Sequence, residues 1–139
     1  MIVDYEKALD DSRFLMSHSP YHKDYDSNLY VAYIVNACKT NSIRLYYREG
    51  KPIGLVTWCY FEPEKAEEFL EFRYLPTEED YIRRPNTQLW GIELIAPFGD
   101  GAYVFKAAKE EYTKLINEGE VVRWRRAKDP LRIHEKRFT

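Results

Sequence analysis

Two residues of this sequence have types and surroundings that suit acid–base chemistry. Glu93 lies in the middle of the apolar segment WGIELIAP at residues 90–97, where a buried carboxylate is costly unless another group pairs with it. His22 ends the segment HSPYH at residues 18–22, and histidine is the side chain that most readily exchanges protons near neutral pH. Because a carboxylate beside an imidazole orients it and raises its basicity, this pair predicts a general base that deprotonates an amine or a hydroxyl.

Each of these residues also has a structural interpretation. Strand alternation turns Glu93 to solvent in one of two registers, and the sequence leaves both orientations equally open. A histidine in a proline-containing loop is more often a surface or capping residue than a base. His134 lies in a basic segment and suits a base less well. Ser19 lacks the Gly-x-Ser-x-Gly surroundings of a nucleophile, which favours a helix N-cap.

A loop and a charged segment are further candidates for binding. The loop PFGDG at residues 97–101 joins a predicted strand to a predicted helix, and amides at a helix N-terminus can hold an oxyanion or a phosphate. It lacks the phosphate-loop and dinucleotide-binding glycine patterns, and Asp100 alternatively caps the helix. The C-terminal segment is basic, which favours a partner-binding surface over a solvated pair of edge strands. Its cations are Arg123, Arg125, Arg126, Lys128, Arg132, Lys136 and Arg137.

Local charge differs strongly along the chain. Residues 62–80 hold eight acidic side chains against Lys65 and Arg73, whereas residues 121–139 are basic. We therefore expect the two ends of the molecule to carry opposite fields, with an acidic partner docking near the C-terminal segment. The formal net charge of −2 over the whole chain argues against a general nucleic-acid binder.

The elements that must position these residues follow from the spacing of apolar side chains. Residues 5–16 favour only a short helix capped near residues 10–12, and a longer amphipathic helix follows Asp26 or Ser27. A β-hairpin is predicted from strands at 43–47 and 53–60, a buried strand at 89–96, a helix between 101 and 119, and two strands around residues 129–130. Residues 62–80 are equally compatible with a helix and a strand. The order predicts a mixed α/β fold.

Composition places the chain among small globular proteins. Its 139 residues, 45% of them hydrophobic, suffice for one domain over residues 1–139. Cys38 and Cys59 sit among apolar neighbours without metal-ligand spacing, which indicates reduced core thiols and no metal site. No signal peptide and no membrane-spanning run is recognisable, so a cytoplasmic protein is expected.

Three segments resemble the signature segments of the toxin-activating lysine acyltransferases, which fatty-acylate bacterial RTX toxins. They are SPYH at 19–22, VTW at 56–58 and, most specifically, WGIELIAPFGD at 90–100. The resemblance extends from about Tyr5 to the C-terminus and is thin between residues 62 and 87. It implies a GNAT-like α/β fold, in which helices flank a mixed, largely antiparallel sheet. It also implies a homodimer that moves a fatty acyl group from acyl carrier protein to a lysine ε-amine of an acceptor protein.

The resemblance also assigns roles to individual residues. It places the catalytic histidine on His22 and the catalytic acid on Glu93. The residues it implies for binding the acyl group and its thioester are Ser19, Trp58, Pro97, Phe98, Gly99, Asp100 and Gly101. The cations expected to dock the acidic acyl carrier protein are Arg123, Arg125, Arg126 and Lys128. The carrier is a co-substrate, and no bound cofactor is expected.

One departure from the family concerns the acid. The family usually has aspartate, and the extra methylene of Glu93 moves the carboxylate by about 1 Å, enough to impair a tight histidine–acid pair. The alternative function is therefore a catalytically inactive protein on the same fold, which captures a partner through its charged patches.

Overall fold

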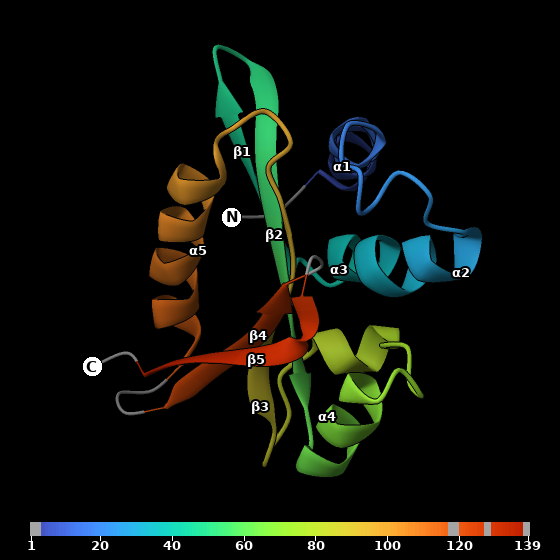
Figure 1. The fold of residues 1–139 in the computed structure, drawn as a ribbon, viewed down its shortest axis with the longest axis vertical. Helices are drawn as coiled ribbons and strands as arrows, with labels where there is room; N and C mark the ends of the chain where they lie inside the picture. Colours follow the sequence, from blue (N-terminus) through green and yellow to red (C-terminus); the bar gives the residue numbers. More distant parts are fainter. Residues whose placement is uncertain (1–3, 117–119, 127–128, 138–139) are drawn as a thin grey trace.

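A five-stranded sheet forms the centre of the molecule in the computed structural model, which describes residues 4–116, 120–126 and 129–137 (Figure 1). The spatial order of the strands is β1-β2-β3-β4-β5. They span Ile43–Arg48, Lys51–Phe61, Gln88–Ile95, Val121–Arg126 and Asp129–Arg137. Neighbouring strands pair antiparallel except for β3 and β4, which are parallel. The sheet therefore confirms the expected mixed, largely antiparallel architecture of the GNAT-like class.

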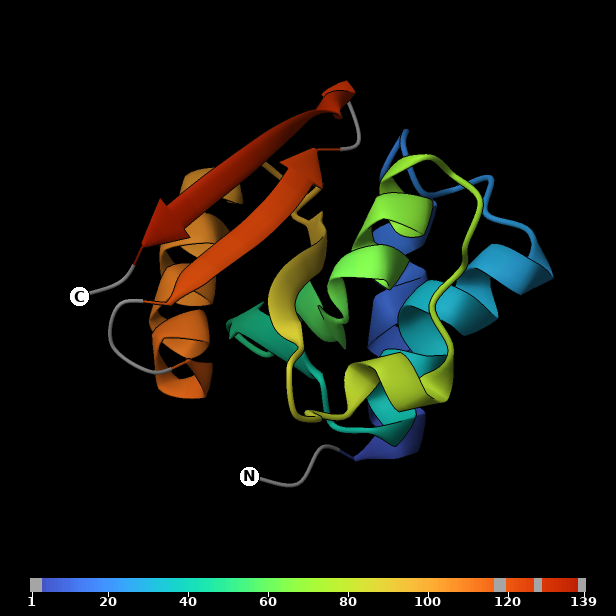
Figure 2. The same ribbon diagram turned by 90° about the horizontal axis from the view of Figure 1, so that it is seen from below.

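Helices cover both faces of this sheet (Figures 1 and 2). One face carries α1 (Tyr5–Ser17), the run of α2 (Ser27–Tyr30), η1 (Val31–Val35) and α3 (Asn36–Lys39), and α4 (Pro63–Leu70); the other carries α5 (Gly101–Leu115). The buried side chains divide accordingly. Ile34 and Phe61 belong to the cluster under the first group of helices, whereas Val104 and Tyr112 belong to the cluster under α5.

The first helix is longer than expected. It begins after Asp4, whose carboxylate accepts a hydrogen bond from the Lys7 amide at 3.1 Å, and continues without a break to Ser17. The prediction of a short helix capped near residues 10–12 was wrong because the apolar positions alone are sparse and polar Ser12 also belongs to the buried stripe. Small buried side chains, Ala8 and Ser12, complete a stripe with Leu15 at helical spacing.

The second helical run confirms the predicted N-cap at Asp26, which accepts from the Leu29 amide at 2.9 Å. Its middle, η1, is a π-helical turn flanked by the α-helical segments α2 and α3. Such turns widen the helix locally and are frequent at functional sites. Here the turn contains Tyr33, which lines the cleft described below.

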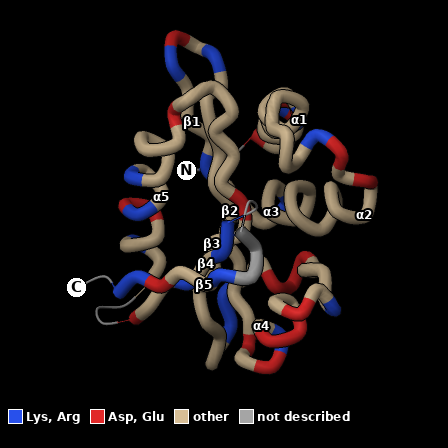
Figure 3. The backbone as a smooth tube through the Cα atoms, in the orientation of Figure 1, with Lys and Arg blue, Asp and Glu red and all other residues tan. Residues whose placement is uncertain are grey.

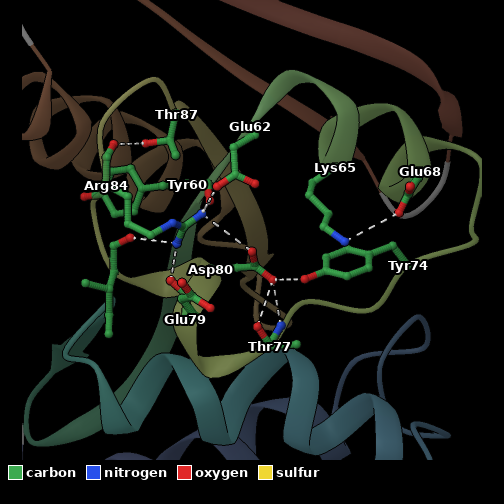
Figure 4. A network of polar contacts seen from close by, with 11 residues as sticks. Tyr60, Glu62, Lys65, Glu68, Tyr74, Thr77, Glu79, Asp80, Arg84 and Thr87 are labelled. Atoms are coloured by element: carbon green, nitrogen blue, oxygen red, sulfur yellow. Dashed lines mark hydrogen bonds and ion pairs between the residues drawn. The ribbon is translucent and has the colours of Figure 1, made fainter.

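Residues 62–80 form helix α4 and a 3-10 turn, η2 (Glu78–Tyr81), with no strand between them. Phe69 and Leu70 belong to the last turn of α4, and residues 71–74 pair with no strand of the sheet. A polar network holds the segment instead (Figure 4). Buried Asp80 accepts from the Tyr74 hydroxyl and from the Thr77 amide at 2.8 Å, and Arg84 pairs with Glu62 at 3.0 Å.

Close packing between β2 and α5 makes Gly54 sensitive to substitution. A Cβ atom there would lie 2.5 Å from Val104 Cγ2 and 3.1 Å from the Ile95 carbonyl oxygen. Gly54→Ala is expected to lower the free energy of unfolding by about 1–3 kcal/mol, as overpacked cores do. Urea denaturation measures it, with Gly101→Ala as the control, because a Cβ at Gly101 meets nothing within 4 Å. Equal stability of the two variants would contradict this packing.

Candidate active site

The carboxylate of Glu93 is buried because strand β3 contains a β-bulge. Trp58 pairs with Gly91 and Val56 with Leu94, so Ile92 and Glu93 both lie opposite Thr57. The extra residue reverses the alternation of β3 once, which re-aims the side chains that follow. The Thr57 hydroxyl accepts a hydrogen bond from the backbone amide of Glu93 at 3.1 Å. The orientation that the sequence left open is thereby settled, with Glu93 only 8% exposed.

The imidazole of His22 reaches this carboxylate from the loop between α1 and α2. The amides of His22 and Lys23 both donate to the Ser19 carbonyl, at 3.1 and 2.9 Å, which makes a tight turn. The turn brings Ser19 Oγ to 2.6 Å from His22 Nδ1, and both residues are buried. Ser19 lies after the end of α1 and well before α2, so the predicted N-cap role for it was wrong.

His22, Glu93 and Tyr25 form a continuous chain of short contacts. His22 Nε2 lies 2.6 Å from Glu93 Oε2, and the Tyr25 hydroxyl donates to Glu93 Oε1 at 2.8 Å. When the carboxylate is ionised it only accepts hydrogen bonds, and a neutral imidazole in this contact then carries its proton on Nε2. The lone pair then lies on Nδ1, facing the Ser19 hydroxyl. The additional methylene of glutamate does not prevent a close histidine–acid contact in this protein.

The pair lies at a cleft of about 930 Å³ that opens where β3 and β4 part. These parallel strands pair only at Trp90 with Arg123 and at Gly91 with Trp124. Most of the wall is apolar or aromatic, whereas Ser19, His22 and Glu93 form a polar corner. The apolar and aromatic lining includes Tyr25, Leu29, Tyr33, Phe69, Phe72, Ile92, Leu94, Ala96, Phe105 and Trp124. This is the composition of a site for a largely apolar ligand that is oriented by a few polar groups.

Burial and the charge of Glu93 keep two neighbouring tyrosines protonated. Burial, reinforced by Glu93, raises the pKa of Tyr25 far above its ordinary value and raises the pKa of Tyr33 to about 12. Both hydroxyls are therefore hydrogen-bond donors at neutral pH. Neither residue was among the predicted site residues. The available signal was weak: Tyr25 follows His22 at the same three-residue spacing that separates Ser19 from His22.

The loop predicted to bind the thioester is only partly at the cleft. Pro97 and Gly101 line it. Gly99 is exposed and has a positive φ of 91°, and the exposed Phe98 ring lies 5.8 Å from the ring of Phe14. Asp100 precedes α5 without a capping hydrogen bond from its side chain; it instead pairs with Arg48 of the β1–β2 hairpin at 2.6 Å. Of this loop, only the two ends are placed to contact a ligand in the cleft.

The structure places Trp58 away from the cleft. Its side chain is buried on the α5 face of the sheet, with its ring 6.1 Å from that of Tyr112. Strand alternation explains this position, because Cys59, the next residue along β2, belongs to the cluster on the opposite face. A direct contact of Trp58 with substrate, as the resemblance implied, does not agree with this geometry.

The basic segment divides into cations with different surroundings. Arg123 pairs with Glu135 at 3.0 Å, Arg126 is exposed at the rim of the cleft, and Lys128 lies outside the described residues. Arg125 points inward. Its guanidinium lies 4.2 Å from the ring centre of Phe69 and donates to the Phe69 and Leu70 carbonyls at 3.3 and 3.4 Å. Burial lowers the pKa of Arg125.

These contacts correct the expected separation of charge. Arg125 of β4 holds the C-terminal end of α4, so the acidic and basic segments are neighbours (Figure 3). The expectation of opposite fields at two ends of the molecule was wrong, because distance along the sequence does not measure distance in the fold.

Removing the Arg125 side chain tests its packing role. Arg125→Ala loses two hydrogen bonds to helix carbonyls and the contacts with Phe69 and Phe72, so the free energy of unfolding should fall by about 2 kcal/mol. Arg126→Ala, the matched control on the same strand, should change it by less than about 0.5 kcal/mol. Urea unfolding of both variants measures these changes. An Arg125→Ala protein as stable as the wild type would show that the contacts of Arg125 with α4 contribute nothing to stability.

Several expectations concern features outside the cleft. Cys38 and Cys59 are buried free thiols, as predicted, and burial raises the pKa of Cys38 to about 11. Within residues 4–116, 120–126 and 129–137, no helix combines the length and apolar character that crossing a membrane requires. In the same residues, His, Cys, Asp and Glu side chains form no group of three that could hold a metal ion.

Fold and site together define an α/β protein of the GNAT-like class, with a buried histidine–glutamate pair in an apolar cleft. The chain belongs to the RTX toxin acyltransferase family, whose model matches residues 2–136. It is 26% identical over 106 residues to the RTX-I toxin-activating lysine-acyltransferase ApxIC of Actinobacillus pleuropneumoniae, an alignment that covers 76% of this chain and 60% of the relative.

Two further relatives carry similar names. The protein-lysine myristoyltransferase HlyC of Escherichia coli is 24% identical over 99 residues, 71% of this chain and 56% of the relative. The leukotoxin-activating lysine-acyltransferase LktC of Mannheimia haemolytica is 22% identical over 112 residues, 81% of this chain and 66% of the relative. The aligned part of the chain thus spans less than two thirds of the length of each relative.

Proposed function

We propose that this protein is a protein-lysine acyltransferase, which moves a fatty acyl group from acyl carrier protein to the ε-amine of a lysine on an acceptor protein. The supporting observation is the contact of 2.6 Å between His22 and Glu93 at the polar corner of an apolar cleft. Family membership and relatives named as lysine acyltransferases support the acylation of a lysine.

The shape and lining of the cleft suit an acyl chain. A volume of about 930 Å³ with aromatic and aliphatic walls can remove a long hydrocarbon from water, at about 0.8 kcal/mol for each methylene buried. Tyr33 of η1 and Phe69 of α4 line one side of this cleft. Phe105 of α5 and Ala96, which follows β3, line the other. The thioester carbonyl would then sit beside His22, with the chain along the apolar wall.

The reaction needs two proton transfers, one to the imidazole of His22 and one from it. The lysine nitrogen attacks the thioester carbonyl carbon, and its proton passes through the Ser19 hydroxyl to Nδ1 of His22. Glu93 stabilises the imidazolium through the Nε2 proton. The carbon–sulfur bond breaks as the amide forms, and the imidazolium returns its proton to the departing thiolate of the carrier. His22 is therefore the general base and general acid, and Glu93 orients and stabilises it.

The remaining assignments concern recognition. We assign the polarisation of the thioester oxygen to the amides at the start of α5, because Gly101 lines the cleft. Exposed Arg126, at the rim of the cleft, is the described cation best placed to contact an acidic carrier. Homodimer assembly and a cytoplasmic location stay predictions of the sequence analysis.

A transfer assay tests the proposal. The protein is incubated with acyl carrier protein charged with saturated fatty acids of several lengths and with candidate acceptors, including RTX toxin fragments. Mass spectrometry of the digested acceptor should show an acyl group on a lysine, in amounts that depend on the enzyme. Stable binding of an acceptor without any acyl transfer to it would favour the alternative, an inactive binding protein.

A further inference from the structure

We infer that Tyr25 is a positioning residue, which holds Glu93 as an anion and thereby decides which nitrogen of His22 is basic. The kinetic consequence rests on the proposed function, whereas the consequence for the imidazole does not. Each oxygen of the buried carboxylate has one donor: Oε2 faces His22 Nε2 at 2.6 Å, and Oε1 accepts from the Tyr25 hydroxyl at 2.8 Å.

No cation neutralises this carboxylate directly. Among the described residues, no lysine or arginine nitrogen lies within 4.0 Å of Glu93, so its ion-pair contact is the one with His22. Arg125 of β4 attracts Glu93 through charge across the same cleft without an ion-pair contact, so hydrogen-bond donors in direct contact supply the remaining stabilisation of the buried charge. The Tyr25 hydroxyl therefore stabilises the anion more than a surface hydrogen bond would.

The other polar groups around Glu93 are committed elsewhere. Tyr81 of η2 donates its hydroxyl to the Ala32 carbonyl at 2.8 Å. Arg125 of β4 donates to the carbonyls of α4, and Tyr33 of η1 interacts with that guanidinium. Thr57 of β2 contacts the backbone amide of Glu93 and not its carboxylate. Among the residues that the structure describes, the Tyr25 hydroxyl is thus the side-chain donor to the carboxylate besides His22.

The state of Glu93 fixes the tautomer of His22. While the carboxylate is charged, the neutral imidazole keeps its proton on Nε2, and Nδ1 is the base that faces Ser19 at 2.6 Å. A protonated Glu93 could itself donate to Nε2, which would reverse the tautomer and leave Nδ1 with a proton. Tyr25 favours the first arrangement, because a hydrogen bond to the charged form of a group lowers its affinity for a proton.

Removing the hydroxyl changes the titration in a defined direction. His22 and Glu93 are in direct contact at 2.6 Å, so a change in the charge of one group acts on the other. In Tyr25→Phe the unprotonated pair loses a donor to its negative charge. The pair then holds the proton more tightly, so the base forms at higher pH. The loss of a hydrogen bond to a charged group should shift the pH at which the base forms by about one unit.

Nitrogen NMR of the imidazoles tests this without any substrate. The chain has three histidines, so His22 is assigned by its absence in a His22→Gln sample. In the wild type we expect the neutral imidazole to carry its proton on Nε2. Tyr25→Phe should raise the pH at which half of the His22 imidazole has lost its proton by about one pH unit, a tenfold change in proton affinity. Tyr21→Phe should leave this pH unchanged. Tyr21 is the matched control, because it is exposed and lines the same cleft.

Two outcomes would overturn the inference. One is a wild-type imidazole protonated on Nδ1, which requires no variant and so is independent of the folding of Tyr25→Phe. The other is a folded Tyr25→Phe protein with the wild-type midpoint and tautomer. Where transfer is observed, the acid limb of its pH–rate profile should move to higher pH in Tyr25→Phe, a shift that lost packing does not produce. Failure of the wild type to transfer an acyl group would count against the proposed function alone.

Discussion

Replacing His22 with glutamine is expected to slow acyl transfer by about 10²–10⁴-fold, the range that general acid–base catalysis contributes. The glutamine amide can still donate to Glu93, so the pairing seen at 2.6 Å keeps a donor. What the variant lacks is a basic nitrogen facing Ser19. The loss should appear in the rate of the chemical step, measured in single turnovers with preformed acyl carrier protein.

The matched control for this variant is His18→Gln. His18 is exposed, and its ring packs against Phe14 and Phe98 at the outer edge of the molecule. The two histidines lie in the same short segment, so the pair of variants separates the base from its loop. A full wild-type rate in His22→Gln, or an equal loss in His18→Gln, would remove His22 from the proposed role.

Replacing Glu93 with glutamine should also slow transfer by about 10²–10⁴-fold, because the developing imidazolium loses its negative partner. The amide offers one oxygen and one nitrogen to two groups that both donate in the wild type, His22 Nε2 and the Tyr25 hydroxyl. One of these contacts must reverse or break. Thermal unfolding should change little or move to higher temperature, because a buried charge is removed.

Glu93→Asp measures how closely the site is fitted to glutamate. Aspartate keeps the charge but withdraws the carboxylate by about 1 Å, which lengthens the contact with His22 and should lower the rate by at least about tenfold. The comparison of the three proteins separates charge from reach. An aspartate variant as fast as wild type would show that the extra methylene is irrelevant, and a fast glutamine variant would exclude Glu93 from catalysis.

Much of the architecture could be predicted from local patterns. The hairpin, the strand around Glu93, the helix after the Pro97–Gly101 loop and the cap at Asp26 all depend on spacing and capping chemistry that a few neighbouring residues determine. The first helix was underestimated, because small residues such as Ala8 and Ser12 contribute to a buried stripe without a strong hydrophobic signal.

The site could be predicted less well from local patterns, because its geometry depends on contacts between distant segments. Glu93 faces inward because β3 has one extra residue opposite Thr57. No local sequence pattern predicts such a bulge. Likewise Trp58 was assigned from the family resemblance, and Arg125 from the positive charge of its segment. The fold turned the first onto the α5 face and the second into the cleft.

The most direct test of the central claim is the position of a bound donor. A crystal structure with an unreactive thioether analogue of a fatty acyl pantetheine would show where the reacting carbon lies relative to His22 and Ser19. We predict that this carbon lies beside Nδ1 of His22, with the hydrocarbon between the β3–β4 opening and the rings of Tyr33 and Phe69. An analogue bound in another part of the molecule, with the cleft still empty, would contradict the account.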